Sequence, residues 1–350
     1  MDLLTYLPKI KKYLAGVDFS SVPGWQAKIP VVIHPLAQGE YNMNYLLSQA
    51  GNRWVLRVNM GSQIDRLDQI AYEFNALRLL ETSGVTPKPY WLDDQKVDLE
   101  FGVLLMEYLP GGSLAYETDL DAAALLLARL HDHPVDSENN HLIRETRPLS
   151  QMYEESSRMA EVYYDSEFAN PVIASYLTEI LDWAKSACDN ERYYLSDPWF
   201  CVINTEVNSG NFIADRNAGK LYLVDWEKPL WGDPSQDLSH FCAPTTTLWK
   251  TGYRMPAADR MKFLNAYRNA VSDPHLKDTI IERVRLRDPF NCLRGITWSA
   301  MAYIQYRSGV HVLQNSDTFE KIQQYLQEDF LHSLFDPYID PACRKAHVIL

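Results

Sequence analysis

Two segments near the middle of the chain constrain its fold and chemistry more than any other stretch. Residues 201–213 (Cys-Val-Ile-Asn-Thr-Glu-Val-Asn-Ser-Gly-Asn-Phe-Ile) and residues 220–227 (Lys-Leu-Tyr-Leu-Val-Asp-Trp-Glu) contain short apolar runs. Runs of this length, bounded by polar turns, are typical of strands. Between and after these runs stand a carboxylate, an amide and a second carboxylate, which are Glu206, Asn211 and Asp225. We therefore expect strands that carry polar groups at their ends.

This order of polar groups suits phosphoryl transfer from ATP. In such reactions one acidic group orients or deprotonates the attacking hydroxyl, while an amide oxygen and another carboxylate hold magnesium on the phosphates. Mg²⁺ prefers hard oxygen ligands and usually takes one or two carboxylates together with phosphate and water. The pattern predicts Glu206 as the catalytic group, Asn211 and Asp225 as metal ligands, and ATP and Mg²⁺ as cofactors.

Three stretches resemble motifs of the aminoglycoside phosphotransferase family. Residues 204–211 (Asn-Thr-Glu-Val-Asn-Ser-Gly-Asn) are similar to its catalytic loop, usually His-Gly-Asp-Leu-His-Pro-Gly-Asn. Residues 223–227 resemble its metal-binding strand end, and residues 232–238 its Gly-Asp-Pro-x-x-Asp-Leu continuation. The resemblance implies a kinase-like α+β fold with two lobes. It places a small β-rich nucleotide-binding lobe in residues 1–108 and a larger, mainly helical lobe with the catalytic loop and substrate pocket in residues 109–350.

The catalytic loop departs from the family pattern at three positions, with Asn204 for His, Thr205 for Gly and Glu206 for Asp. One extra methylene moves the carboxylate by about an ångström, and a misplacement of ~1 Å can cost ~100-fold in rate. A shifted loop backbone could absorb the longer side chain. Two interpretations stay open: an ATP-dependent kinase of a small hydroxylated molecule, or a kinase-like protein that binds nucleotide or a partner without turnover. Adenylyl transfer from the same pocket is a third.

An expected nucleotide-binding lobe precedes this loop. Residues 53–59 alternate as a half-buried strand, and a helix follows from about residue 64 to residue 82. The resemblance implies that Arg57 faces the phosphates of ATP and that Glu73, on the helix, pairs with it, as the basic residue of the third strand pairs with a helix glutamate in protein kinases. The alternatives are a solvent-facing strand arginine and an exposed helix glutamate.

Two further stretches of this lobe suggest contacts to ATP. Residues 31–47 form a strand–turn–strand pattern, in which Gly39 and Asn42 resemble the family's Gly-x-x-Asn turn over the phosphates. With a single glycine, an ordinary hairpin is the simpler explanation. Residues 101–112 resemble the hinge between kinase lobes, where backbone groups near Glu107 and Leu109 would bind adenine. A core strand that ends in a Pro-Gly-Gly turn is a compatible alternative.

The rest of the chain is expected to be mainly helical and structural in role. Asp237 is expected to brace the backbone of the catalytic loop, and Asp233 to cap a helix. His131 and His133 are expected to pack at a helix end, because a spacing of two places them on different helix faces. An aromatic-rich run around residues 298–306 suggests core packing, with a pocket for a cationic substrate as the alternative.

Composition limits the partners of the chain. A formal net charge of −13 over 350 residues argues against nucleic acid or an anionic membrane as the main partner. An acidic surface would favour a cationic substrate, although a role in solubility is the simpler explanation. The five cysteines are scattered and odd in number, so we expect reduced thiols. The N-terminus lacks the pattern of a signal peptide, and no apolar run is long enough for a membrane span, so we expect a cytoplasmic protein. We expect it to be a monomer or a homodimer.

Overall fold

A computed structural model of the chain describes residues 2–39, 41–62, 64–309 and 316–340. They pack into two compact units. The first comprises residues 1–114, 133–143 and 210–230, and the second comprises residues 115–132, 144–209 and 231–350. The predicted lobe boundary between residues 108 and 109 stays a prediction.

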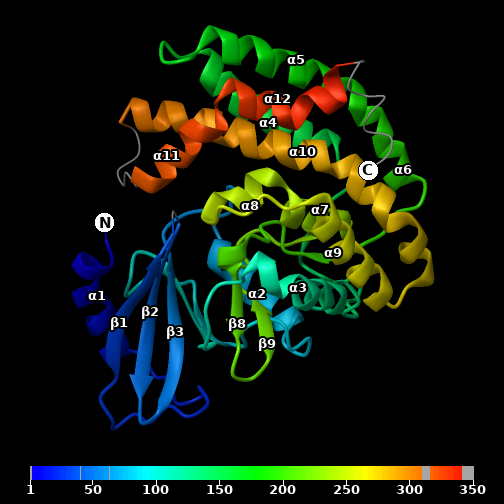
Figure 1. Cartoon of the computed structure of the whole chain (residues 1–350). Coiled ribbons are helices and arrows are strands. Elements are labelled where there is room, and N and C mark those ends of the chain that lie inside the picture. The colour runs from blue at the N-terminus through cyan, green and yellow to red at the C-terminus, as the bar shows by residue number, and fades with distance from the viewer. Residues whose placement is uncertain (1, 40, 63, 310–315, 341–350) are drawn as a thin grey trace. The chain divides into compact units, whose positions relative to one another are not determined.

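The first unit contains an antiparallel five-stranded sheet in the order β1-β2-β3-β5-β4 (Figure 1). Its strands are β1 (Val32–Gln38), β2 (Asn42–Gln49), β3 (Asn52–Asn59), β4 (Pro89–Asp93) and β5 (Gly102–Glu107). Strands β2 and β3 join through a two-residue turn, Ala50-Gly51, in which both residues have positive φ. This turn matches the twist of the paired strands, and it fixes the register that places Asn44 opposite Arg57.

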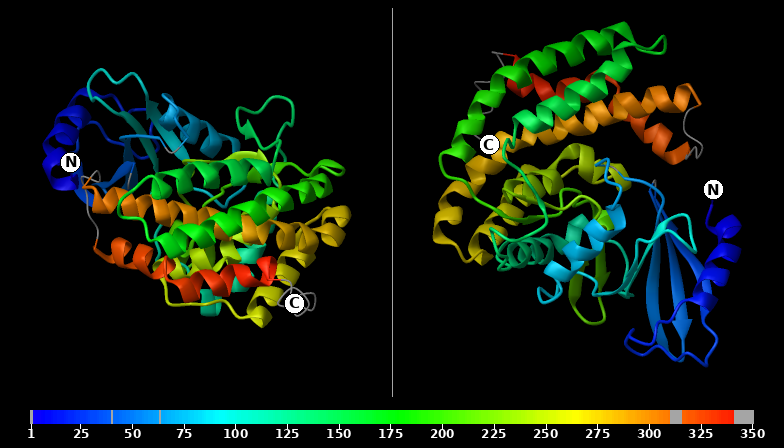
Figure 2. Two further views of the ribbon diagram at one scale, coloured as in Figure 1. Left: turned by 90° about the horizontal axis from the view of Figure 1, so that it is seen from above. Right: turned by 180° about the vertical axis from the view of Figure 1, so that it is seen from behind.

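Helix α1 (Leu3–Gly16) packs on one face of this sheet (Figures 1 and 2). It begins at Asp2, whose carboxylate accepts hydrogen bonds from the backbone N–H groups of Leu4 and Thr5. Side chains in a strand alternate between the two faces of the sheet, so every second residue of β2 and β3 meets this helix. The shared core consists of Tyr6, Ile10, Tyr13, Met43, Tyr45, Leu47, Trp54, Leu56 and Val58.

Helix α2 (Gln69–Leu79) lies on the opposite face, where β3 presents Arg57. It is shorter than the predicted span of residues 64–82. At its start, the Ser62 hydroxyl accepts hydrogen bonds from the N–H groups of Ile64 and Arg66, which holds the chain in a turn. The helix ends at Leu79, and the N–H of the next residue, Leu80, donates to the Ala76 carbonyl at 3.1 Å. Strands β8 (Phe212–Asp215) and β9 (Lys220–Leu223) form a separate hairpin in this unit.

The second unit is mainly helical, which confirms the predicted α+β class together with the N-terminal sheet. Figures 1 and 2 show α4, α5, α10 and α12 lying alongside one another. The helices are α3 (Tyr116–His131), α4 (Ser150–Tyr164), α5 (Pro171–Ala187), α6 (Arg192–Leu195), α7 (Ser235–Cys242), α8 (Pro244–Lys250), α9 (Ala257–Ala270), α10 (Pro274–Arg307), α11 (Ser316–Tyr325) and α12 (Glu328–Ile339), with a 3₁₀ turn at Cys188–Glu191. The remaining short elements are β6 (Ile143–Arg144), β7 (Cys201–Ile203), β10 (Leu230–Gly232) and a 3₁₀ turn at Ser209–Asn211.

The core of the second unit is built around α10. Its Leu293, Ile296 and Ala300 are fully buried and share one cluster with Leu177 of α5 and Phe335 of α12. The aromatic run at the end of α10 packs against this cluster as predicted. Its ring contacts are Trp249 with Trp298, and Tyr303 and Tyr306 with Phe319.

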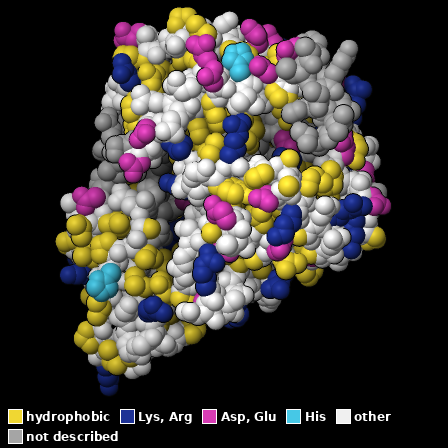
Figure 3. Space-filling model, in the orientation of Figure 1, with side chains coloured by type: hydrophobic (Ala, Val, Ile, Leu, Met, Phe, Trp, Pro, Cys, Tyr) yellow, Lys and Arg dark blue, Asp and Glu magenta, His cyan; other side chains and the backbone are white. Residues whose placement is uncertain are grey.

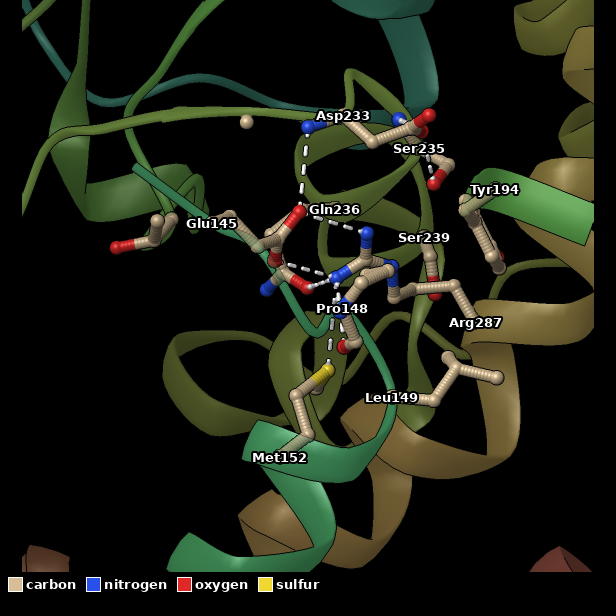
Figure 4. Close-up of polar contacts among 12 residues, drawn as sticks. Glu145, Pro148, Leu149, Met152, Tyr194, Asp233, Ser235, Gln236, Ser239 and Arg287 are labelled. Atoms are coloured by element: carbon tan, nitrogen blue, oxygen red, sulfur yellow. Dashed lines mark hydrogen bonds and ion pairs between the residues drawn. The ribbon is translucent and has the colours of Figure 1, made fainter. Parts of the chain in front are cut away.

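A buried ion pair also holds α10 in place (Figure 4). The guanidinium of Arg287 binds both carboxylate oxygens of Glu145, at 2.7 and 3.0 Å, and donates to the carbonyl of Pro148 at 3.1 Å. Glu145 in turn accepts a hydrogen bond from the backbone N–H of Asp233. Because both side chains are buried, removal of either charge would leave the other buried without its partner.

The surface of the first unit carries exposed apolar side chains, among them Leu4 on α1 and Val32 and Leu36 on β1. Figure 3 shows apolar side chains gathered where α1 and β1 lie in Figure 1. Pro35 and a bulge beside it interrupt β1, an edge strand, and such features discourage pairing with another chain.

Within the described residues, no helix is long and apolar enough to cross a membrane. Cys188, Cys201, Cys242 and Cys292 carry free thiols, as predicted, and Cys343 lies outside the described residues.

Candidate active site

Arg57 is the centre of a charged cluster in the first unit. Its Nη1 atom lies 2.5 Å from the Glu73 carboxylate and 3.0 Å from that of Asp225, and its Nε donates to Asn44 on the neighbouring strand at 3.0 Å. The side chains of Arg57 and Glu73 are only 7% and 1% exposed, so the alternatives of a solvent-facing arginine and an exposed glutamate are wrong. The predicted Arg57–Glu73 pair is confirmed, and Asp225 joins it.

Several carboxylates act on the charge of Arg57. Burial alone lowers the pKa of Arg57, but the carboxylates of Glu73, Asp225 and Glu227 outweigh burial and raise it. Burial raises the pKa of Glu73 despite the opposing effect of Arg57. The Arg57 guanidinium therefore stays charged among these carboxylates. Sequence reasoning did not assign Glu227, although it follows Asp225 by only two residues.

The two predicted metal ligands lie on adjoining parts of the β8–β9 hairpin. Phe212 pairs with Leu223 in the hairpin. Directly beyond this pair, the Val224 N–H donates a hydrogen bond to the Asn211 carbonyl at 2.8 Å. Asp225 follows at once, with φ of +66° and a side chain that is 29% exposed. Its carboxylate is therefore the accessible one of the cluster, since Glu73 is buried.

The predicted ligands are oxygen donors of the kind that Mg²⁺ prefers. In the described part of the chain no three His, Cys, Asp or Glu side chains gather as a metal site. An amide and a carboxylate are instead a sparse set of hard oxygen donors, which Mg²⁺ completes with phosphate and water. The assignment of Asn211 and Asp225 to Mg²⁺ stays a prediction.

The turn predicted to cover the phosphates is tied to the residues beyond Asp225. Asn42 is buried, and its amide donates to the Glu227 carboxylate and accepts a hydrogen bond from Asn59. The Gly39 N–H donates to the Asn42 carbonyl and closes the turn, while Glu40 lies outside the described residues. The Asn42 side chain thus stabilises the turn, and contacts of Gly39 and Asn42 to phosphate stay predictions.

The predicted adenine-binding stretch ends β5. The Glu107 N–H donates to the Lys88 carbonyl at 2.8 Å, and the Glu107 carboxylate accepts from the Lys88 N–H at 3.2 Å. The Glu107 N–H is therefore used within the protein. Leu109 is buried. A role of either residue at adenine stays a prediction.

In the second unit, Asp237 braces the backbone of the catalytic loop, as predicted. Its two carboxylate oxygens accept hydrogen bonds from the N–H groups of Asn204 and Thr205, at 2.8 and 2.7 Å. His131 lies 3.3 Å from the same carboxylate and 2.9 Å from the Tyr267 hydroxyl. His131 is therefore a packing histidine at the end of α3, which confirms that interpretation.

Asp233 caps the start of α7, as predicted. Its carboxylate accepts hydrogen bonds from both the N–H and the hydroxyl of Ser235. These bonds satisfy a donor in the first turn of the helix, which has no partner within the helix itself.

The loop keeps a glycine-like backbone although its glycine is missing. Thr205 adopts φ of +73°, a conformation that glycine reaches easily and that costs another residue about 1–2 kcal/mol. The Glu206 N–H donates to the Asn204 side chain at 3.1 Å, and the Glu206 carbonyl accepts from the Asn208 N–H at 2.8 Å. The substituted Asn204 thus supports the residue at the catalytic position.

Comparisons with solved structures confirm the kinase-like fold. Choline kinase from Cryptosporidium parvum has a TM-score of 0.63 and 14% identity, with 95% of this chain and 99% of that chain covered. Spectinomycin phosphotransferase in complex with ADP and spectinomycin has a TM-score of 0.56 and 12% identity, covering 87% and 91%. A thermostable mutant of an aminoglycoside phosphotransferase, in ternary complex with AMP-PNP and hygromycin B, has a TM-score of 0.56 and 14% identity, covering 93% and 98%.

Sequence comparison identifies the family. No curated protein sequence matches the chain closely enough to show a relationship. The sequence profile of the phosphotransferase enzyme family matches residues 32–276, which include the sheet of the first unit, the catalytic loop and Asp225. The chain therefore belongs to the phosphotransferase enzyme family.

Proposed function

We propose that this protein transfers the γ-phosphate of ATP to a hydroxyl group of a small molecule. The observation that supports this most is the cluster in which Arg57 binds both Glu73 and Asp225, with Asn211 beside Asp225 on the same hairpin. Kinase-like enzymes need an arginine or lysine for the phosphates, held by a glutamate, and an Asp–Asn pair for the metal. All four groups belong to one compact unit.

Each residue has a role in this proposal. Arg57 contacts the phosphates, because a guanidinium suits paired hydrogen bonds to phosphate oxygens. Asn211 and Asp225 hold Mg²⁺, which neutralises negative charge on the phosphates when it is bound. Glu206 accepts a hydrogen bond from the acceptor hydroxyl and takes its proton as the new oxygen–phosphorus bond forms. The bond between the γ-phosphorus and the bridging oxygen breaks, and ADP leaves.

The acceptor we favour is an alcohol that carries a positive charge. The net charge of −13 raises the local concentration of cations around the protein. A choline kinase is among the proteins with this fold, and choline is a cationic alcohol. Aminated sugars, aminated cyclic alcohols and short amino alcohols therefore form the first panel of acceptors.

The test is turnover followed by mass spectrometry. The protein is incubated with Mg-ATP and each acceptor, and we expect an acceptor whose mass rises by one phosphate group, with an equal amount of ADP. Glu206→Gln should lower kcat by about 100-fold or more, since general-base catalysis contributes ~10²–10⁴-fold. A mass increase of AMP would assign adenylyl transfer instead. Nucleotide binding without any product across the panel would favour the non-catalytic alternative.

A further inference from the structure

Arg294, on α10, lies between two carboxylates in the second unit. Its Nε atom is 3.2 Å from the Glu155 carboxylate on α4, and its Nη2 atom is 3.9 Å from the Glu206 carboxylate in the catalytic loop. The Arg294 side chain is 17% exposed, whereas that of Glu206 is 27% exposed. A positive charge on a largely buried side chain thus lies near the carboxylate that we propose as the base.

The helix that carries Arg294 is held firmly at this point. A Cβ atom added to the neighbouring Gly295 would lie 2.8 Å from the side chain of Thr245, so α10 and α8 are in close contact. Leu293 and Ile296 on either side are fully buried. A side chain on such a segment has little freedom to move away, as a group that orients a reacting residue requires.

The backbone of Glu206 is held independently of Arg294. Asn204 and Asn208 fix its N–H and its carbonyl. These contacts involve the backbone and not the carboxylate, which is one methylene further from the backbone than that of the aspartate usual in the family. The Arg294 guanidinium lies within ion-pair distance of this carboxylate, and the carboxylates of Glu155 and Glu206 outweigh the effect of burial and raise the pKa of Arg294.

We propose that Arg294 is a positioning residue that holds the longer Glu206 carboxylate, ionised and in one place, for the acceptor hydroxyl. This inference rests on the proposed function, because it assumes that Glu206 is the base. It explains how the loop can carry Glu in place of Asp, because the Arg294 guanidinium holds the carboxylate of the longer side chain. The competing explanation is that Arg294 only joins α10 to α4 through Glu155.

The kinetic test compares Arg294→Met in two backgrounds. In the otherwise unchanged protein we expect kcat to fall by ~10–100-fold, as for a carboxylate misplaced by about an ångström, with KM for ATP unchanged within about two-fold. Arg294→Lys should retain more of the rate, because it keeps the charge. With Glu206→Asp already present, Arg294→Met should lower kcat by less than about three-fold, since the shorter carboxylate does not reach the guanidinium.

The matched control is Arg285→Met, also on α10, whose ion pair with Glu282 is exposed. It should leave kcat unchanged. Equal losses of kcat from Arg294→Met in both backgrounds would show a merely structural role and overturn the inference. Melting curves of every variant identify those that do not fold.

A second measurement does not depend on turnover. The carboxyl carbon of Glu206, labelled with ¹³C and assigned by its loss in Glu206→Gln, is titrated by NMR. Without Arg294 the Glu206 signal should titrate at higher pH, because a neighbouring cation favours the ionised carboxylate. An unchanged titration overturns the inference even if no acceptor is found. Absence of turnover together with a shifted titration would refute only the proposed function.

Discussion

Replacing Arg57 by methionine should strongly lower stability, because it breaks a buried ion pair. The change leaves Glu73, which is 1% exposed, without the guanidinium 2.5 Å away, and it removes the bonds to Asn44 and Asp225. Truncating one partner of a buried ion pair typically costs about 3–5 kcal/mol, because the other charge stays buried. We therefore expect the free energy of unfolding to fall by ~3–5 kcal/mol, as measured by urea denaturation with tryptophan fluorescence.

A second substitution, at Glu73, tests whether the unpaired buried carboxylate causes the loss of stability. Adding Glu73→Leu to Arg57→Met removes the unpaired carboxylate, so most of the lost stability should return. Arg53→Met is the matched control on the same strand, since Arg53 is exposed and lies over the ring of Tyr108, and it should cost less than about 1 kcal/mol. If the double variant is no more stable than Arg57→Met, the reasoning from burial is wrong.

The pH dependence of stability tests the same explanation, which is the buried Glu73 carboxylate left without Arg57. Burial raises the pKa of Glu73, and removing Arg57 removes an influence that lowers it. A carboxyl with a higher pKa in the folded than in the unfolded state binds more protons when folded, so stability falls as pH rises above the unfolded-state pKa. The stability lost in Arg57→Met should therefore be smaller at pH 5 than at pH 7. An equal loss at both pH values would contradict this.

Three further predictions concern the second unit. Asp237→Asn should lower the free energy of unfolding by about 2–4 kcal/mol in urea denaturation. The reason is that one of two buried N–H groups, at Asn204 or Thr205, loses its charged acceptor. A loss below about 0.5 kcal/mol would mean that these hydrogen bonds contribute little to stability. Arg287→Met should cost about 3–5 kcal/mol in the same assay by leaving Glu145 buried and unpaired, and Arg285→Met should be neutral. Thr205→Gly should preserve turnover and change the free energy of unfolding by less than about 1 kcal/mol. The relieved backbone strain in the folded state offsets the greater freedom that glycine gives the unfolded chain. A loss of activity beyond about ten-fold would show that the threonine side chain has a role of its own.

The contacts that could be predicted from the sequence involve residues of motifs that recur in kinase-like proteins. The pairing of Arg57 with Glu73 follows from a strand-borne arginine and a helix that starts soon after it, once a kinase-like fold is recognised. The brace by Asp237 follows similarly from the spacing of the family motifs. In each case the recurring motif predicts a long-range contact that could not be predicted from the individual residues.

Other contacts had no signal of this kind. Arg294 lies almost ninety positions after Glu206 on a helix whose periodicity shows only that the helix is buried, so nothing in the sequence indicates that it meets the loop. The start of α2 was predicted too early because Ser62 holds the preceding residues in a turn through side-chain hydrogen bonds, which compete with helix formation. The positive φ of Thr205 could not be predicted either, since β-branched residues rarely adopt it.

The central claim is that Arg57, Asn211 and Asp225 form a site for the phosphates of ATP and their magnesium ion. Calorimetric titration of Mg-ATP tests it directly, with the protein compared to Asp225→Asn and to Asp189→Asn, a control at an exposed aspartate of the second unit. The account predicts binding at micromolar to millimolar Mg-ATP, weakened by about ten-fold or more in Asp225→Asn and unchanged in the control. Binding that is equally strong in Asp225→Asn, or no binding of Mg-ATP to the unaltered protein, would contradict it.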